Sequence, residues 1–131
     1  MAFLLLDTTV LIDLLRGRPG AVSRLAALRR QGDRPCVCAV NVEEVVRGLR
    51  PDEEADARRL LAGLRLAPLG RDEGWQAGEW RRQHAASGQT LTQADCLIAA
   101  AAAGLGGRLA TGNPRHFAMP ELAVEHWPAG G

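Results

Sequence analysis

Short unbroken apolar runs alternate along the chain with longer segments in which apolar residues recur every three or four positions. The runs at 2–7, 36–40, 66–69, 108–111 and 122–127 predict strands. The longer segments predict helices over 8–16, 21–30, 41–48, 51–64, 72–86 and 92–103. Strands that alternate with helices indicate an α/β fold, with a mostly parallel central sheet flanked by helices on both faces.

The length and the composition fit one ordinary domain. The chain has 131 residues, of which 47% are hydrophobic and 24% charged, so we expect a single domain over 1–131. The last four residues, from Pro128, are expected to fray. No apolar run approaches the roughly 20 residues of a spanning helix, and the N-terminus lacks the basic start of a signal peptide. We therefore expect a cytoplasmic protein without a membrane partner.

Cysteine usage and net charge exclude little. Cys36, Cys38 and Cys96 form an odd set without a C-x-x-C pair, which favours buried, reduced thiols. The net charge is only +1, so no strong overall field attracts nucleic acid. All sixteen basic residues are arginine, whose planar fork suits phosphate. Two roles are open for several of these arginines: they contact a polyanion, or they form a solvated face of a helix. These arginines are Arg47, Arg50, Arg58, Arg59, Arg81 and Arg82.

Three acids stand where a strand or a turn gives way to a helix. Asp7 closes the first apolar run, and it has a simple alternative role as the cap of the next helix. Glu44 follows Asn41 by three positions, a spacing typical of a capping box. Asp95 follows Thr92 in the same way. Helix capping therefore explains each acid locally, without any chemistry.

The predicted sheet brings these acids together, and that favours a second role. The carboxyl ends of parallel strands share one edge, and ligands bind there in open α/β sheets. Asp7, Glu44, Asp95 and Asn113 all belong near that edge. Carboxylate and amide oxygens are the ligands of hard cations such as Mg²⁺ and Mn²⁺.

Several neighbouring residues leave alternatives open. Glu43 competes with Glu44, and side chains of adjacent helical residues point about 100° apart, so only one of the two can face the site. Asp13 is expected to be solvated or to pair with Arg16. His116 either contacts a phosphate or is structural. Trp75 and Trp80 are expected to pack in a core or an interface.

Segments in order along most of the chain resemble PIN-domain ribonucleases, specifically the VapC toxins of bacterial type II toxin–antitoxin systems. The matching segments are 3–17 (FLLLDTTVLIDLLRG), 42–49 (VEEVVRGL), 91–102 (LTQADCLIAAAA), 109–117 (LATGNPRHF) and 124–127 (VEHW). The resemblance implies that Asp7 is the first metal-binding acid, accompanied by Thr9, and that Asp95 is the third.

The resemblance also implies the other two site positions. The family's second acid usually stands four residues before a glycine, so Gly48 selects Glu44 over Glu43. The fourth position, often Asp in PIN domains and often Asn in these toxins, is Asn113. An amide there lowers the charge of the site by one.

This family likeness implies a metal-dependent endoribonuclease that cleaves RNA phosphodiesters with water activated by Mg²⁺ or Mn²⁺. Thr9, Thr111 and Asn113 would orient water or phosphate. The likeness further implies a homodimer and a cognate VapB-like antitoxin, whose tail would block the pocket through an Arg.

Three alternatives remain. A phosphoacceptor or phosphatase domain would use Asp7, but a receiver needs a Lys on a late strand and the chain has none. Such phosphatases also need a second Asp where Thr9 stands. A non-catalytic PIN-like module would have lost one of the acids, and all three are present. A non-toxin PIN nuclease in RNA processing differs mainly in size, and the short chain favours the toxin.

Overall fold

In the part of the chain that the structure describes, five parallel strands form the centre of the protein. The computed structural model describes residues 2–88 and 90–131. The strands are β1 (Phe3–Leu6), β2 (Arg34–Val37), β3 (Arg65–Leu66), β4 (Arg108–Thr111) and β5 (Ala123–His126). They lie in the order β3-β2-β1-β4-β5, and each neighbouring pair is parallel. The predicted parallel α/β sheet is therefore confirmed, with β1 in the middle and β3 and β5 at the two edges.

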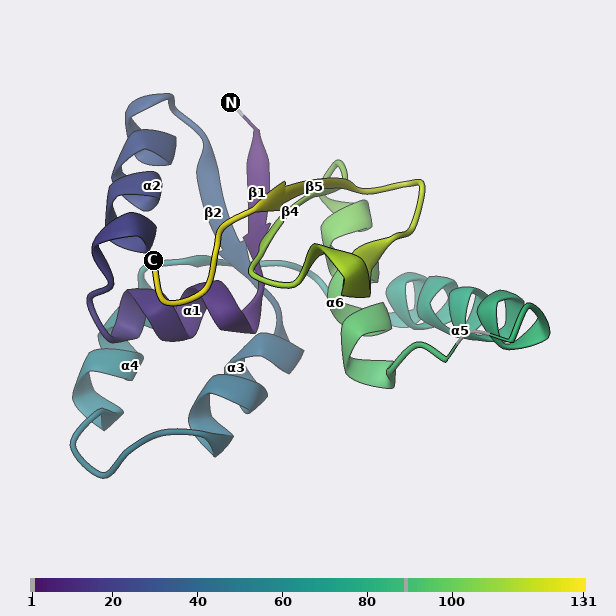
Figure 1. Ribbon diagram of the computed structural model, residues 1–131, viewed down its shortest axis with the longest axis horizontal. Helices are drawn as coiled ribbons and strands as arrows, with labels where there is room; N and C mark the ends of the chain where they lie inside the picture. The colour runs from purple at the N-terminus through teal and green to yellow at the C-terminus, as the bar shows by residue number, and fades with distance from the viewer. Residues whose placement is uncertain (1, 89) are drawn as a thin grey trace.

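Helices cover both faces of the sheet (Figure 1). The first four are α1 (Thr8–Leu15), α2 (Pro19–Arg30), α3 (Ala39–Arg47) and α4 (Glu54–Ala62). The later elements are α5 (Arg71–Ala86), α6 (Gln93–Gly104) and the short 3₁₀ helix η1 (Pro114–Phe117).

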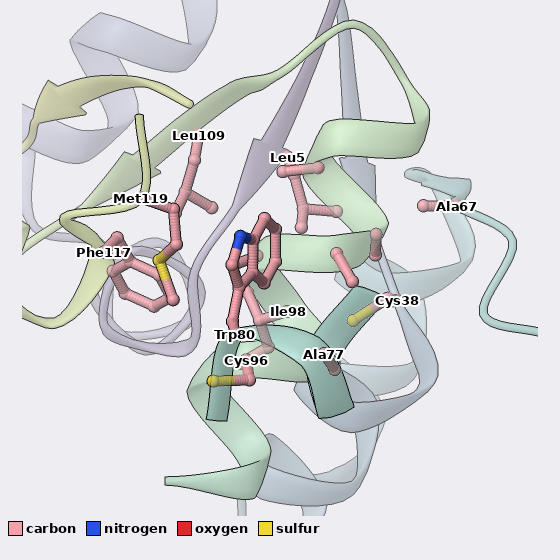
Figure 2. Close-up of a cluster of buried hydrophobic side chains, with 14 of the residues drawn as sticks. Leu5, Cys38, Ala67, Ala77, Trp80, Cys96, Ile98, Leu109, Phe117 and Met119 are labelled. Atoms are coloured by element: carbon pink, nitrogen blue, oxygen red, sulfur yellow. The ribbon is translucent and has the colours of Figure 1, made fainter. Parts of the chain in front are cut away.

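Alternation along β1 divides the core in two. Leu4 and Leu6 pack with α1, α2 and Val45 of α3, whereas Leu5 faces α5 and α6. Figure 2 shows the second cluster, in which Trp80 of α5 lies beside the sheet residue Leu5 and the helix α6. The alanines at 99–102 of α6 are almost completely buried, and their small side chains let this helix lie close to the sheet. The two layers hold the carboxyl ends of β1 and β4 at one level.

The strand β2 and the helix α3 start earlier than the sequence predicts. The predicted strand over 36–40 is instead Arg34–Val37, and α3 begins at Ala39 rather than at Asn41. Cys38 is the residue that precedes the helix, and its backbone N–H donates to Asn41 Oδ1 at 3.0 Å. Asn41 thus lies inside the first turn, so the predicted capping box with Glu44 is wrong.

The C-terminal residues lie against α1 and α2, where the sequence predicted fraying (Figure 1). The Gly130 N–H donates to Asp13 Oδ2 at 2.9 Å, and the Gly20 N–H donates to the Gly131 oxygen at 2.8 Å. Asp13 is consequently buried. The prediction that Asp13 is solvated or pairs with Arg16 is wrong, because the tail occupies its carboxylate.

Three further findings concern the cysteines, membrane-spanning helices and the tryptophans of α5. The three cysteines are buried and unbridged, as predicted. Within residues 2–88 and 90–131, no helix combines the length and the apolarity needed to cross a bilayer. Trp80 is buried in the core as expected, whereas Trp75 is 71% exposed on α5.

Candidate active site

A polar pocket of about 310 Å³ opens at the carboxyl ends of β1 and β4, beside the first turns of α1 and α6. It is lined by Asp7, Thr8, Thr9, Glu44, Arg47, Gly48, Asp95, Asn113 and His116. The structure thus brings together the three predicted acids, the predicted amide and Thr9. The pocket collects side chains from four separate segments of the sequence.

Asp7 is held between the first strand and the first helix. Its backbone N–H donates to the Ala110 carbonyl at 2.8 Å, and its own carbonyl accepts the first hydrogen bonds of α1. The side chain makes no capping bond, although Asp7 occupies the capping position. Its Oδ2 instead accepts the hydroxyl of Thr111 at 2.7 Å and, more weakly, that of Thr9 at 3.4 Å. The capping alternative for the Asp7 carboxylate is therefore wrong.

Burial and neighbouring charge make a negative Asp7 unfavourable. Loss of solvent is the main reason that the pKa of Asp7 lies above its ordinary value, and repulsion from Asp95 and Glu44 raises it further. The hydrogen bond from the Thr111 hydroxyl is the largest influence that opposes this rise in the Asp7 pKa, because it stabilises the charged form. A buried carboxylate that two neighbouring carboxylates repel in a common pocket favours a bound cation.

The structure separates Glu44 from Glu43. The Glu44 side chain is 23% exposed and its Oε1 accepts the Thr8 hydroxyl at 2.6 Å. The Glu43 side chain is 59% exposed and accepts two hydrogen bonds from Arg47, at 2.9 and 3.1 Å. Arg47 also approaches Glu44, with 3.9 Å between Nη2 and Oε2. The pocket therefore contains Glu44, the acid that the Gly48 spacing selects.

Asp95 reaches the pocket from the first turn of α6. Thr92 caps this helix, since its hydroxyl oxygen accepts the Asp95 backbone N–H at 3.1 Å. The predicted capping role of Thr92 is confirmed in this bond. The Asp95 carboxylate remains available to the pocket, where its Oδ2 lies 3.3 Å from His116 Nδ1. Capping and site roles are thus carried by different atoms of one turn.

The loop after β4 is tied to Asp7 by two hydroxyl groups. Thr111 accepts the Asn113 N–H at 3.0 Å, and Thr9 accepts the Gly112 N–H at 2.9 Å. A side chain at Gly112 would lie 3.2 Å from Thr9 Oγ1, so glycine permits this close approach. Thr111 is fully buried behind the pocket, where it supports Asp7, while Asn113 is exposed at the pocket wall.

Two polar residues in this region were not predicted as part of the site. Thr8 donates to Glu44, and Asn41 in turn donates to Thr8 through Nδ2 at 3.2 Å. Asn41 is completely buried. The only sequence signals were the position of Thr8 beside Asp7 and the spacing of Asn41 three residues before Glu44.

The donors present fit a hard divalent cation. Asp7, Glu44, Asp95 and Asn113 offer carboxylate and amide oxygens, the ligand type of Mg²⁺ and Mn²⁺. In the arrangement described for residues 2–88 and 90–131, no three His, Cys, Asp or Glu side chains have closed to the spacing of a metal cage. The carboxylates of Asp7, Glu44 and Asp95 line one pocket, and their oxygens would hold such an ion.

Comparison with known proteins identifies the family to which the chain belongs. A family model described as "PIN domain" matches residues 4–122. The chain is 35% identical over 118 residues to the ribonuclease VapC10 of Mycobacterium tuberculosis, covering 90% of this chain and 88% of that protein.

Solved structures of toxin–antitoxin proteins share the fold. A chain of VapBC2 from Rickettsia felis, bound to a promoter DNA fragment, has a TM-score of 0.82 at 21% identity and covers 95% of this chain and 98% of its own. A toxin–antitoxin complex from Klebsiella pneumoniae contains a chain with a TM-score of 0.73 at 26% identity, covering 94% and 96%. With the family model and the curated relative in agreement, the chain belongs to the PIN-domain family of VapC-type ribonucleases.

Proposed function

We propose that this protein is a metal-dependent endoribonuclease that acts as a VapC-like toxin. The single observation that carries the proposal is the convergence of Asp7, Glu44 and Asp95 in one pocket. These acids come from the end of β1, from α3 and from the start of α6, and the burial of Asp7 together with repulsion from Asp95 and Glu44 favours a cation in the pocket.

The proposed assignment gives each residue a separate task. Asp7, Glu44 and Asp95 would hold Mg²⁺ or Mn²⁺, and Asn113 would contribute an amide that orients water or the scissile phosphate. When bound, the ion would lower the pKa of a water molecule and neutralise charge on the phosphate. In-line attack on the phosphodiester would leave a 5′-phosphate and a 3′-hydroxyl.

Other polar residues in and behind the pocket would position the Asp7 carboxylate and contact the RNA. Thr111 and Thr9 fix the Asp7 carboxylate through their hydroxyl groups. Arg47 lies at the pocket wall, where its guanidinium would attract the RNA backbone. The His116 ring lines the pocket beside Asp95 and would contact the same RNA backbone.

A VapB-like antitoxin is the proposed protein partner. The similar Klebsiella structure is a toxin–antitoxin complex. An acidic pocket suits an incoming guanidinium, which pairs with carboxylates through two parallel hydrogen bonds. An apolar groove between α3 and α4, about 660 Å³ in volume, includes the exposed Val46, the neighbour of the pocket residue Arg47. A segment with an apolar helix and an Arg would fit both surfaces.

We also propose a homodimer and a cytoplasmic location, as the sequence predicts.

Cleavage of RNA by purified protein tests the function. The wild-type protein should cut RNA in Mg²⁺ or Mn²⁺, stop in EDTA and recover when Mn²⁺ is restored. Asp7→Asn and Glu44→Gln should each abolish cleavage while retaining a cooperative thermal transition. Glu43→Gln is the matched control, because Glu43 points away from the pocket, and it should retain far more activity than Glu44→Gln. Cleavage that persists in EDTA, or in Asp7→Asn, would contradict the proposal.

A further inference from the structure

A buried polar chain stands behind the second acid of the pocket. Asn41, completely buried in the first turn of α3, uses both ends of its amide. Its Oδ1 accepts the Cys38 backbone N–H at 3.0 Å and the Cys38 thiol at 3.2 Å, while its Nδ2 donates to Thr8 Oγ1 at 3.2 Å. A buried amide is unfavourable unless its polar atoms are paired, and here they are.

One backbone group determines the direction of every hydrogen bond in this buried polar chain. The Cys38 N–H can only donate, so the carbonyl end of Asn41 must face it and the NH₂ end must face Thr8. Thr8 Oγ1 is thereby an acceptor for Asn41, and its single proton is left for Glu44 Oε1, 2.6 Å away. The chain therefore presents a hydrogen-bond donor to the Glu44 carboxylate.

This donor is the strongest restraint on Glu44 within the part of the chain that the structure describes. The other polar neighbour of Glu44 is Arg47, at 3.9 Å, and the Arg47 side chain is 67% exposed and bonded to Glu43. A long contact to an exposed arginine holds a carboxylate weakly. The Thr8 bond also joins the start of α1, which follows Asp7, to α3, which carries Glu44, and so links two of the three acids.

We infer that Asn41 and Thr8 are positioning residues for the second acid of the site, acting in series through the Thr8 hydroxyl. The inference rests on the proposed function, since it assigns Asn41 and Thr8 a role in binding the divalent ion. Partners that orient a metal-binding side chain typically change metal affinity or activity 10–100-fold when removed. Loss of this polar chain should lower kcat and Mn²⁺ affinity while leaving the KM for RNA nearly unchanged, because Asn41 is completely buried and the Thr8 hydroxyl is engaged by Asn41 and Glu44.

Two nearly isosteric variants break the chain at different points. Thr8→Val removes the hydroxyl that Glu44 accepts. Asn41→Asp preserves the acceptor for Cys38 but replaces the NH₂ group with an oxygen, so Thr8 Oγ1 loses its donor and the Thr8 proton gains a second acceptor that competes with Glu44. Asn41→Asp also adds a carboxyl group near the pocket. General electrostatic attraction would then strengthen Mn²⁺ binding, whereas the loss of positioning weakens it, so the sign of the change separates the two explanations.

The experiment measures Mn²⁺ affinity by isothermal titration calorimetry, together with kcat, KM and thermal unfolding, in the full chain. Thr8→Val and Asn41→Asp should each bind Mn²⁺ about 10–100-fold more weakly. Thr8→Ser retains the hydroxyl and should keep most of the wild-type Mn²⁺ affinity. The double variant Thr8→Val/Asn41→Asp should bind Mn²⁺ no more weakly than the single variant that has the lower affinity. If Thr8→Val fails to unfold cooperatively, Asn41→Asp and Thr8→Ser still decide the question.

The outcomes separate this inference from the proposed function. Wild-type affinity in Thr8→Val, tighter binding in Asn41→Asp or additive losses in the double variant would overturn the positioning role and leave the nuclease assignment intact. Wild-type protein that binds Mn²⁺ but cuts no RNA would overturn the nuclease assignment, while weaker Mn²⁺ binding by both variants would still support the positioning role. Wild-type protein that binds no Mn²⁺ would overturn both.

Discussion

Thr111→Val isolates one hydrogen bond to the buried Asp7. Thr111 is fully buried, and its hydroxyl donates to Asp7 Oδ2 at 2.7 Å. A bond to an ionised group contributes about 1.5–3 kcal/mol, and a bond between neutral groups contributes about 1 kcal/mol. Valine preserves the shape of the side chain, and water can replace Thr111 as the acceptor for Asn113 because Asn113 is exposed. We expect a loss of about 2 kcal/mol in the unfolding free energy at neutral pH.

The loss should depend on pH, with a sign fixed by the Asp7 pKa. Burial already raises that pKa, and the Thr111 bond is the largest influence that lowers it. A carboxyl group with a raised folded pKa gives its full stability below its unfolded pKa, and the stability falls as the pH rises through the folded pKa. Without Thr111 the folded pKa rises further, so the variant loses more stability than the wild type. The difference should grow from about 1 kcal/mol in acid toward about 2 kcal/mol at neutral pH.

Urea unfolding in EDTA, repeated across a series of pH values, measures this difference without a bound ion. Thr111→Ser is the control, because it retains the hydroxyl and loses only a methyl group. Its difference from the wild type should be nearly independent of pH. A Thr111→Val difference that stays constant or shrinks as the pH rises would refute the reasoning about Asp7.

Three further predictions concern charge and packing. Asp7→Asn should raise the melting temperature of the metal-free protein at neutral pH, because it removes a buried carboxylate that Asp95 and Glu44 repel; a lower melting temperature in EDTA would count against that strain. Asn113→Asp should tighten Mn²⁺ binding in calorimetry by adding a fourth carboxylate to the pocket, and unchanged affinity would place Asn113 outside the ion's ligands. Trp80→Ala should cost about 3–5 kcal/mol in urea unfolding, whereas Trp75→Ala on the same helix should change stability by no more than about 0.5 kcal/mol; equal losses would contradict the core in Figure 2.

The alternation of strands and helices predicted the architecture well, because local periodicity follows from burial on the faces of the sheet. The unbroken run before Asp7 and the Ala-rich helix after Asp95 were sufficient to place two acids at one edge. These features are local, and the parallel topology then determines where they meet.

The errors came from contacts between distant segments. Asn41 looks like a helix cap in isolation, but it lies inside the first turn and its amide pairs with Thr8, 33 residues away in the sequence. Asp13 looks exposed until Gly130, far along the sequence, donates to it. No local pattern encodes either contact, since each depends on how separate elements pack.

The choice between Glu43 and Glu44 was only partly predictable from the sequence. Residue types alone left Glu43 and Glu44 equivalent, because the answer depends on how α3 is rotated. The end of β2 and the Asn41 contact set that rotation, and they turn Glu44 toward Thr8.

The most direct test of the central claim is a crystal structure of the protein with Mn²⁺, analysed by anomalous diffraction. We predict one strong manganese peak in the pocket, with carboxylate oxygens of Asp7, Glu44 and Asp95 drawn to about 2.0–2.6 Å from it or joined to it through ordered water. Manganese bound only elsewhere on the surface, with these three carboxylates left apart, would contradict the account.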